Sequence, residues 1–251
     1  MQDLQGDEVK MIFVDKVKTG LKDVGKDCLI RNESILEILE NVGGEHSNLA
    51  RYGILDIERT KLSWILLDWK VKVIKRPVYA DQLEVKTWGR CFKKAYTYRD
   101  FEIHNSKGEL CVIATSKWAM INIETRKIVR MGDEIREAYL PEDHSVFDED
   151  ALPKPEVPIE FSNEFQYTVS RKDIDINGHM HNTYYLNLAY EVLPEDVYNA
   201  RPYDSFRITY KHEIKLGDTV VCKYSQINNK HVVIIMNEEE SIVNAIIELT
   251  K

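Results

Sequence analysis

The sequence lacks the features that would place it in a membrane or in an oxidising compartment. No apolar run in its 251 residues approaches the length of a membrane-spanning helix, and the opening residues M-Q-D-L-Q-G-D-E contain neither the basic nor the apolar region of a secretory signal. The few cysteines show no C-x-x-C spacing, which argues against a zinc site and a disulfide framework; they are Cys28, Cys91, Cys111 and Cys222. We therefore expect a cytoplasmic protein with no membrane span and reduced thiols.

An excess of positive charge is also lacking. The formal net charge is -8 at pH 7, which argues against general affinity for nucleic acid, because binding by counterion release needs many basic contacts. A local basic cluster consists of Lys70, Lys72, Lys75, Arg76, Arg90, Lys93 and Lys94. This cluster is either a solvated face of a sheet or a guide for an acidic partner.

The richest stretch of chemically capable side chains lies between residues 173 and 194. Asp175, Asn177 and His179 alternate with apolar residues, and in an extended segment such residues point to one side. Asn177-Gly178 is a turn signal, and a short apolar run that ends before Pro194 predicts a buried helix. Backbone amides in the first turn of that helix, near residues 178 to 182, would face the polar side chains and could polarise a carbonyl.

Each of these residues also has a structural interpretation. His179 could be a histidine satisfied within the core, and Asp173 and Asp175 could cap the turn. His181 forms an H-x-H pair with His179, but no third ligand follows at a recognisable spacing, so we expect no metal. Glu213 is unusual in a predicted strand, because glutamate is depleted in strands. It either faces solvent beside two lysines or faces the start of the helix.

The order of predicted elements occurs twice along the chain. A strand at residues 9–18 precedes a helix that begins near Asn32, which Gly43-Gly44 could break or kink, and strands follow from Lys61 to residue 130. Residues 132–161 are acidic and hold four of the seven prolines, which predicts an extended linker. The expected organisation is an N-terminal domain at 1–138, a linker at 139–161 and a C-terminal domain at 162–251.

A weak internal match supports duplication. The sixteen residues from Val71 align without gaps to those from Ile208, which places Asp81 on Asp218 and Arg76 on Glu213. No D-x-N-x-H triplet precedes the first helix. We therefore expect the first half to shape the site and the second half to carry the chemistry.

The chain resembles the acyl-acyl carrier protein thioesterases of plant plastids and bacteria. The matching segments, in chain order, are K-R-P, Y-R-D-F-E-I, A-T-S-K-W, E-T-R-K-I-V-R, D-I-D-I-N-G-H-M-H-N and Y-K-H-E. The resemblance implies an α+β fold of two tandem hotdog domains, each a long central helix wrapped by an antiparallel sheet. It also implies a catalytic set of Asp175, Asn177, His179 and Glu213. Plant members have a cysteine directly after that glutamate, whereas this chain has Ile214, which favours attack by water.

The implied reaction is hydrolysis of a fatty acyl-acyl carrier protein thioester to free fatty acid, with no cofactor and no metal. Water would be activated by Glu213, His179 or both, and Asn177 together with helix amides would stabilise the oxyanion. The implied partner is the acyl carrier protein. An acyl-coenzyme A thioesterase and a non-catalytic acyl-binding module are the alternatives, since fold does not fix function. Chain-length preference and homodimer formation stay open.

Overall fold

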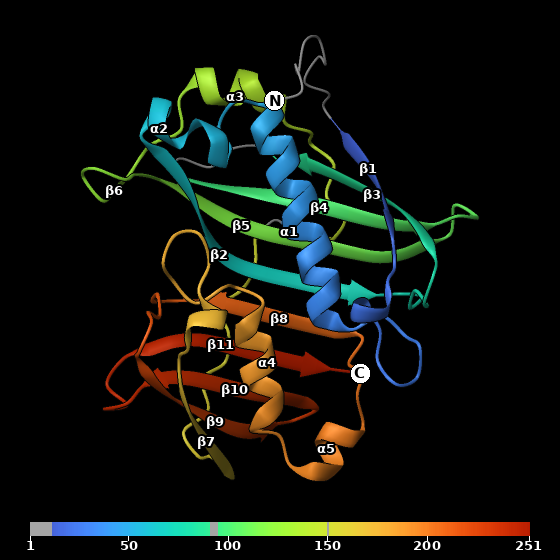
Figure 1. The fold of residues 1–251 in the computed structure, drawn as a ribbon, viewed down its shortest axis with the longest axis vertical. Helices are drawn as coiled ribbons and strands as arrows, with labels where there is room; N and C mark the ends of the chain where they lie inside the picture. The colour runs from blue at the N-terminus through green and yellow to red at the C-terminus, as the bar shows by residue number, and fades with distance from the viewer. Residues whose placement is uncertain (1–11, 91–94, 150) are drawn as a thin grey trace. The chain divides into compact units, whose positions relative to one another are not determined.

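The computed structural model describes residues 12–90, 95–149 and 151–251, which form two compact units (Figure 1). Unit 1 contains the described residues up to Ile30, Glu37–Leu67, and those from Val73 to residue 149. Unit 2 contains Arg31–Leu36, Asp68–Lys72 and Ala151–Lys251. Each unit is described by itself below.

Unit 1 is an antiparallel sheet with one long helix across it (Figure 1). Its strands are β1 (Phe13–Lys18), β2 (Leu62–Val73), β3 (Gln82–Gly89), β4 (Tyr96–Asn105), β5 (Leu110–Asn122) and β6 (Lys127–Ile128). The strand order is β1-β3-β4-β5-β2, and β6 pairs with β5. Its helices are α1 (Asn32–Leu49), whose first turn is grouped with unit 2, α2 (Ile57–Thr60) and α3 (Asp133–Tyr139).

The long helix α1 continues through Gly43-Gly44, so the expected break at this pair is wrong. Gly43 is buried, and a Cβ atom placed on it would lie 3.4 Å from Cδ of Arg99 and 3.5 Å from the ring of Phe101, both on β4. The glycine lets the helix backbone approach the sheet closely, which offsets its low helix propensity. Gly43 is therefore a packing feature of the helix, and the glycine pair does not end it.

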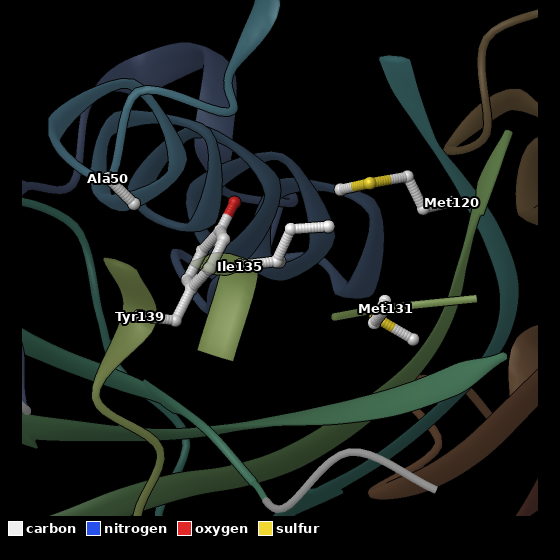
Figure 2. Packing of buried hydrophobic residues seen from close by; sticks show 5 residues of the cluster. All are labelled: Ala50, Met120, Met131, Ile135 and Tyr139. Atoms are coloured by element: carbon white, nitrogen blue, oxygen red, sulfur yellow. The ribbon is translucent and has the colours of Figure 1, made fainter. Parts of the chain in front are cut away.

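The acidic, proline-rich stretch at residues 132–161, which was expected to be extended, begins with a helix. Residues 133–139 form α3, and Ile135 and Tyr139, four positions apart, are buried on one face of it. Figure 2 shows both side chains packed in a cluster with Ala50, Met120 and Met131. The extended conformation predicted from Gly132 onward is therefore wrong for this segment, because two large apolar side chains at helical spacing outweigh the acidic composition around them. The domain boundaries given above stay predictions.

Unit 2 repeats the plan with a shorter helix. Its strands are β7 (Asn163–Thr168), β8 (Ser205–Tyr210), β9 (Thr219–Ile227), β10 (Lys230–Asn237) and β11 (Val243–Thr250). Residues Asp68–Lys72 of β2 pair with β8, and the order continues β8-β11-β10-β9-β7. Its helices are α4 (Tyr184–Glu191), which crosses the sheet as predicted, and α5 (Glu195–Asn199) (Figure 1). In the described part of the chain, no helix is long and apolar enough to cross a membrane.

A buried ion pair fixes β8 inside unit 2. Arg207 donates from Nε to Oδ1 of Asp68 at 2.8 Å and from Nη2 to Oδ2 at 2.7 Å, and the hydroxyl of Thr209 also donates to Asp68 at 3.1 Å. Bidentate pairing of this kind restricts geometry as well as charge. The strand that leads toward Glu213 is therefore held in one register.

The two units form the same hydrogen bonds at the corner that precedes each helix. The amide of Gly25 donates to the carbonyl of Leu29 at 2.9 Å in unit 1, and Asp175 donates to His179 at 2.8 Å in unit 2. Leu29 forms an antiparallel bridge with Val78, and His179 forms one with Lys215. Val78 and Lys215 are equivalent in the ungapped alignment of the halves, so these bonds confirm its register.

Two glycine substitutions test the continuity of α1 at Gly44 and the close approach of Gly53 to the last turn of this helix. A Cβ at Gly53 would lie 2.6 Å from the backbone nitrogen of Asn48, whereas nothing lies within 4 Å of a Cβ at Gly44. We expect Gly53→Ala to lower the free energy of unfolding by about 1 to 3 kcal/mol through steric strain. Gly44→Ala should raise it by up to about 1 kcal/mol, because alanine favours a helix interior. Thermal unfolding checks both; a clear loss of stability in Gly44→Ala contradicts a continuous helix.

Candidate active site

The polar triplet lies on a tight turn and not on an extended strand. The amide of Gly178 donates to the carbonyl of Asp175 at 3.1 Å, and Ile174 forms an antiparallel bridge with Met180. Gly178 has φ of +79°, a left-handed conformation that glycine adopts without strain. The predicted alternation of side chains on one face is therefore wrong, because the chain reverses direction between Asp175 and His179.

Asp175 organises this turn. Its Oδ1 accepts the backbone amides of Asn177 at 2.8 Å and His179 at 3.1 Å, and its Oδ2 accepts Nδ2 of Asn177 at 3.3 Å. One carboxylate thus fixes the backbone of both neighbours and the side-chain amide of Asn177. This geometry supports the orienting role implied for Asp175.

Asp173 has a structural role one turn earlier. Its Oδ2 accepts hydrogen bonds from the amide and the hydroxyl of Ser170, both at 2.8 Å, and from the hydroxyl of Tyr167 at 2.7 Å. Burial alone would raise the pKa of Asp173, but the hydrogen bonds from Tyr167 and Ser170 lower it below its usual value. Asp173 is committed to holding the 3₁₀ turn Arg171–Asp173.

Glu213 reaches the turn from a loop. Strand β8 ends at Tyr210, so the expectation of a mid-strand glutamate is wrong. Oε2 of Glu213 lies 3.0 Å from Nε2 of His179, and Oε1 lies 3.2 Å from Nζ of Lys215. Both side chains are open to solvent, at 53% for Glu213 and 34% for His179. The structure therefore brings the predicted acid and the predicted histidine into direct contact.

The residue after Glu213 points away from this pair. The side chain of Ile214 is fully buried, and its carbonyl accepts the amide of Met180 at 2.8 Å. A side chain at this position enters the core beneath the loop. In this chain the position after Glu213 therefore offers no nucleophile.

Two tyrosines beneath the site were not singled out from the sequence. Tyr185, in the first turn of α4, is buried and meets Tyr210 edge to face with ring centroids 5.1 Å apart. Burial raises the pKa of Tyr185 well above its usual value, so the hydroxyl stays protonated. Tyr210 donates to the carbonyl of Asn182 at 3.0 Å. The sequence signal at Tyr185 was only its place in the apolar run that predicted the buried helix before Pro194.

Most of the amides proposed for an oxyanion hole are already engaged. Gly178 and His179 donate to Asp175, and Met180 and His181 donate to the carbonyls of Ile214 and Asp173, all at 2.8 to 3.1 Å. Amides that are bonded internally do not present a free hydrogen to a substrate. Asn182 follows directly, and within the described residues its amide has no acceptor.

His181 and the basic cluster have local partners. Nδ1 of His181 lies 3.0 Å from the hydroxyl of Thr183, and the structurally described residues include no group of three His, Cys, Asp or Glu arranged to hold a metal ion. In the basic cluster, Lys75 pairs with Glu109, Arg90 with Asp100, and Arg76 donates to the carbonyl of Ile30. Lys93 and Lys94 lie outside the described residues. Local pairing favours a structural interpretation of the cluster.

Unit 1 has the same backbone corner but lacks the acid and the histidine side chains. Leu29 takes the place of His179 in the bridge, and Gly25 takes the place of Asp175 in the corner hydrogen bond. Arg76 aligns with Glu213. Unit 1 therefore retains the backbone of the site but has no acid-histidine pair at this place.

A helix laid across an antiparallel sheet, twice in one chain, is the arrangement of tandem hotdog proteins. Family models described as the N-terminal and C-terminal domains of acyl-ACP thioesterase match residues 10–139 and 156–251. The chain belongs to the acyl-ACP thioesterase family.

Two plant thioesterases are similar to the chain in sequence. The chain is 26% identical over 215 residues to the chloroplastic oleoyl-acyl carrier protein thioesterase 1 of Arabidopsis thaliana, covering 79% of this chain and 59% of that protein. It is 27% identical to the chloroplastic palmitoyl-acyl carrier protein thioesterase of Cuphea hookeriana, covering 81% and 52%. The chain thus spans between half and three fifths of the length of these two relatives.

Solved structures share the fold. The acyl-ACP thioesterase of Bacteroides thetaiotaomicron superposes with a TM-score of 0.83 at 21% identity, covering 96% of this chain and 97% of that one. The 12:0-ACP thioesterase of Umbellularia californica gives a TM-score of 0.84 at 18% identity with the same coverage. The predicted α+β fold of tandem hotdog units is therefore confirmed.

Thiol chemistry should be dispensable for thioester hydrolysis, the reaction that names the family. Burial raises the pKa of Cys222 to about 12 and also raises that of Cys111, so neither is an available thiolate at neutral pH. Cys28 is exposed, and Cys91 lies outside the described residues. We expect alkylation with iodoacetamide to leave turnover unchanged. Stoichiometric inactivation traced by mass spectrometry to one cysteine, and prevented by substrate, would contradict this.

Proposed function

We propose that the chain hydrolyses fatty acyl-acyl carrier protein thioesters, releasing a free fatty acid and the holo carrier protein. The observation that carries this proposal is the 3.0 Å contact between Nε2 of His179 and Oε2 of Glu213, in a chain of the acyl-ACP thioesterase family. The names of the plant relatives support a carrier-bound acyl group as the substrate. The proposed reaction needs no cofactor and no metal.

The acid-histidine pair would activate water. An ionised Glu213 accepts a hydrogen bond, so the neutral imidazole of His179 donates from Nε2 and keeps its lone pair on Nδ1. Water loses a proton to Glu213 or to Nδ1 as its oxygen attacks the thioester carbonyl carbon. When the C–S bond breaks, the pair returns that proton to the leaving thiolate. Atoms and charge balance without an external reagent.

The oxyanion would be stabilised by amide hydrogens near the turn. Nδ2 of Asn177 uses one hydrogen on Asp175 and has a second available. The backbone amide of Asn182 is the other candidate, since the amides of residues 178–181 are engaged. Preorganised donors of this kind stabilise the developing charge without reorganisation during the reaction.

The two halves would divide binding and chemistry. Unit 1 retains the corner but has Leu29 and Arg76 where unit 2 has His179 and Glu213. A helix packed across a sheet offers an apolar layer that can admit an acyl tail, and α1 buries Ile35, Leu36, Leu39 and Val42. We assign acyl-chain binding to residues 1–138 and catalysis to residues 162–251.

Two other functions use the same features. An acyl-coenzyme A thioesterase would cleave the same bond, so turnover of one acyl chain on the two handles separates them. An acyl-binding module would bind without releasing thiol, and the intact acid-histidine pair argues against it. A panel of acyl-carrier thioesters assayed for free thiol is the direct test; binding without thiol release would overturn hydrolysis.

Alanine substitution of the proposed catalytic residues tests the site. We expect His179→Ala and Asn177→Ala to lower turnover by roughly two to three decades, the scale of losing one acid-base group or one oxyanion donor. His181→Ala is the matched control, because His181 lies two residues away and contacts Thr183 instead. Its turnover should stay within a few fold. Near-normal turnover in a folded His179→Ala protein sinks the assignment.

Chimaeras test the division between the halves. Exchanging residues 1–138 with a family member of different chain-length preference should transfer the product profile. The preference should be graded, because one methylene in an apolar pocket is worth about 1 to 3 kcal/mol. Gas chromatography of released fatty acids gives the profile. A profile that follows residues 162–251 instead shows the division to be wrong.

A further inference from the structure

Asn244 occupies a β-bulge next to the loop that presents Glu213. Val243 and Ala245 pair with consecutive residues of β10, which leaves Asn244 as an extra residue in β11. On the other side of β11, the pairing with β8 ends at Tyr210 opposite Ala245. The bulge therefore lies where β8 stops and the Glu213 loop begins. Bulges often redirect a strand beside an active site.

One buried residue contacts three consecutive residues of this loop. The carbonyl of Asn244 accepts the amides of Lys211 at 2.8 Å and His212 at 3.2 Å. Its side-chain Nδ2 lies 3.4 Å from the carbonyl of His212 and 3.5 Å from that of Glu213, as long hydrogen bonds. Asn244 is only 6% exposed, so its amide is fixed by packing.

The carbonyl oxygen of the Asn244 side chain is unfavourable for stability. Oδ1 of Asn244 is buried and has no hydrogen-bond partner among the described residues. A buried acceptor without a partner destabilises the folded state, so a smaller and less polar side chain would suit the position better. The Nδ2 group of Asn244 must therefore have a role other than stabilising the fold.

Unit 1 contains the same bulge without the amide. Cys111 is the extra residue of β5, since Ile103 and His104 pair with its two neighbours. Its carbonyl accepts the amides of Ile74 at 2.8 Å and Lys75 at 3.1 Å, the pair that precedes Arg76. The backbone arrangement is thus present in both units. The asparagine occurs only in the unit that has the acid-histidine pair.

We propose that Asn244 is a positioning residue that holds the backbone of Glu213 so that its carboxylate meets His179. Met180 bonds the loop from the side of the turn, through the carbonyl of Ile214, and Asn244 bonds it from the side of the sheet. Glu213 and His179 are both partly exposed, so their own attraction is too weak to fix the loop. This inference rests on the proposed thioesterase function.

Asn244→Cys is the sharpest test, because unit 1 shows that the bulge accepts cysteine. We expect a folded protein whose kcat falls about tenfold while KM changes by less than about twofold, since the contact is lost without loss of substrate binding. In a Glu213→Gln background the substitution should have no further effect on kcat, because residues that act together are non-additive. Unchanged kcat, or an independent loss in that background, overturns the proposal.

Hydrogen exchange provides a readout that does not depend on activity. We expect residues 211–216 to exchange faster in Asn244→Cys than in the unsubstituted protein. Cys111→Ala, the matched change at the other bulge, should leave both kcat and the exchange of residues 211–216 unchanged. If the unsubstituted protein fails to hydrolyse acyl-carrier thioesters, the proposed function is wrong, and exchange still decides the role of Asn244. Equal exchange in the two proteins overturns that role.

Discussion

The site depends on the closure of one turn by the carboxylate of Asp175. Because Asp175 accepts the amides of both Asn177 and His179, the backbone of this segment is fixed before any substrate arrives. The positive φ of Gly178 completes the reversal, so that the chain returns alongside the Glu213 loop and His179 bridges Lys215. Reversal of the chain, and not alternation along a strand, brings the imidazole to the glutamate.

A frame made of backbone hydrogen bonds does not depend on the side chains it presents. Both units build the same corner and the same bulge, although unit 1 has Leu29, Arg76 and Cys111 where unit 2 has its chemistry. One copy can therefore lose the reactive groups without losing the fold. This independence supports the proposed division, in which the first half binds the acyl chain and the second half carries the reaction.

An exposed contact between an acid and a histidine does not hold itself in place. Surface pairs contribute between about 0 and 1 kcal/mol, and the contact of His179 with Glu213 is open to solvent. Buried groups must therefore fix the position of Glu213. They are the side chain of Ile214, the packed rings of Tyr185 and Tyr210, and the bulge at Asn244. These buried groups hold the loop in place, which leaves the reacting groups accessible to water and substrate.

The sequence by itself determined the α+β order of elements in each half and the buried helix before Pro194, because local spacing and motif resemblance record them. It also predicted Asp175, Asn177, His179 and Glu213 as the site, and the structure brings these four residues together. It did not determine the reversal of the chain from Asp175 onward, the continuation of α1 through Gly43, the helix at residues 133–139, or the end of β8 at Tyr210. These depend on contacts between segments far apart in the chain, such as the packing of Gly43 against β4. Asn244 shows this most clearly, since its place follows from a register shift between two strands, and no local pattern encodes a register shift.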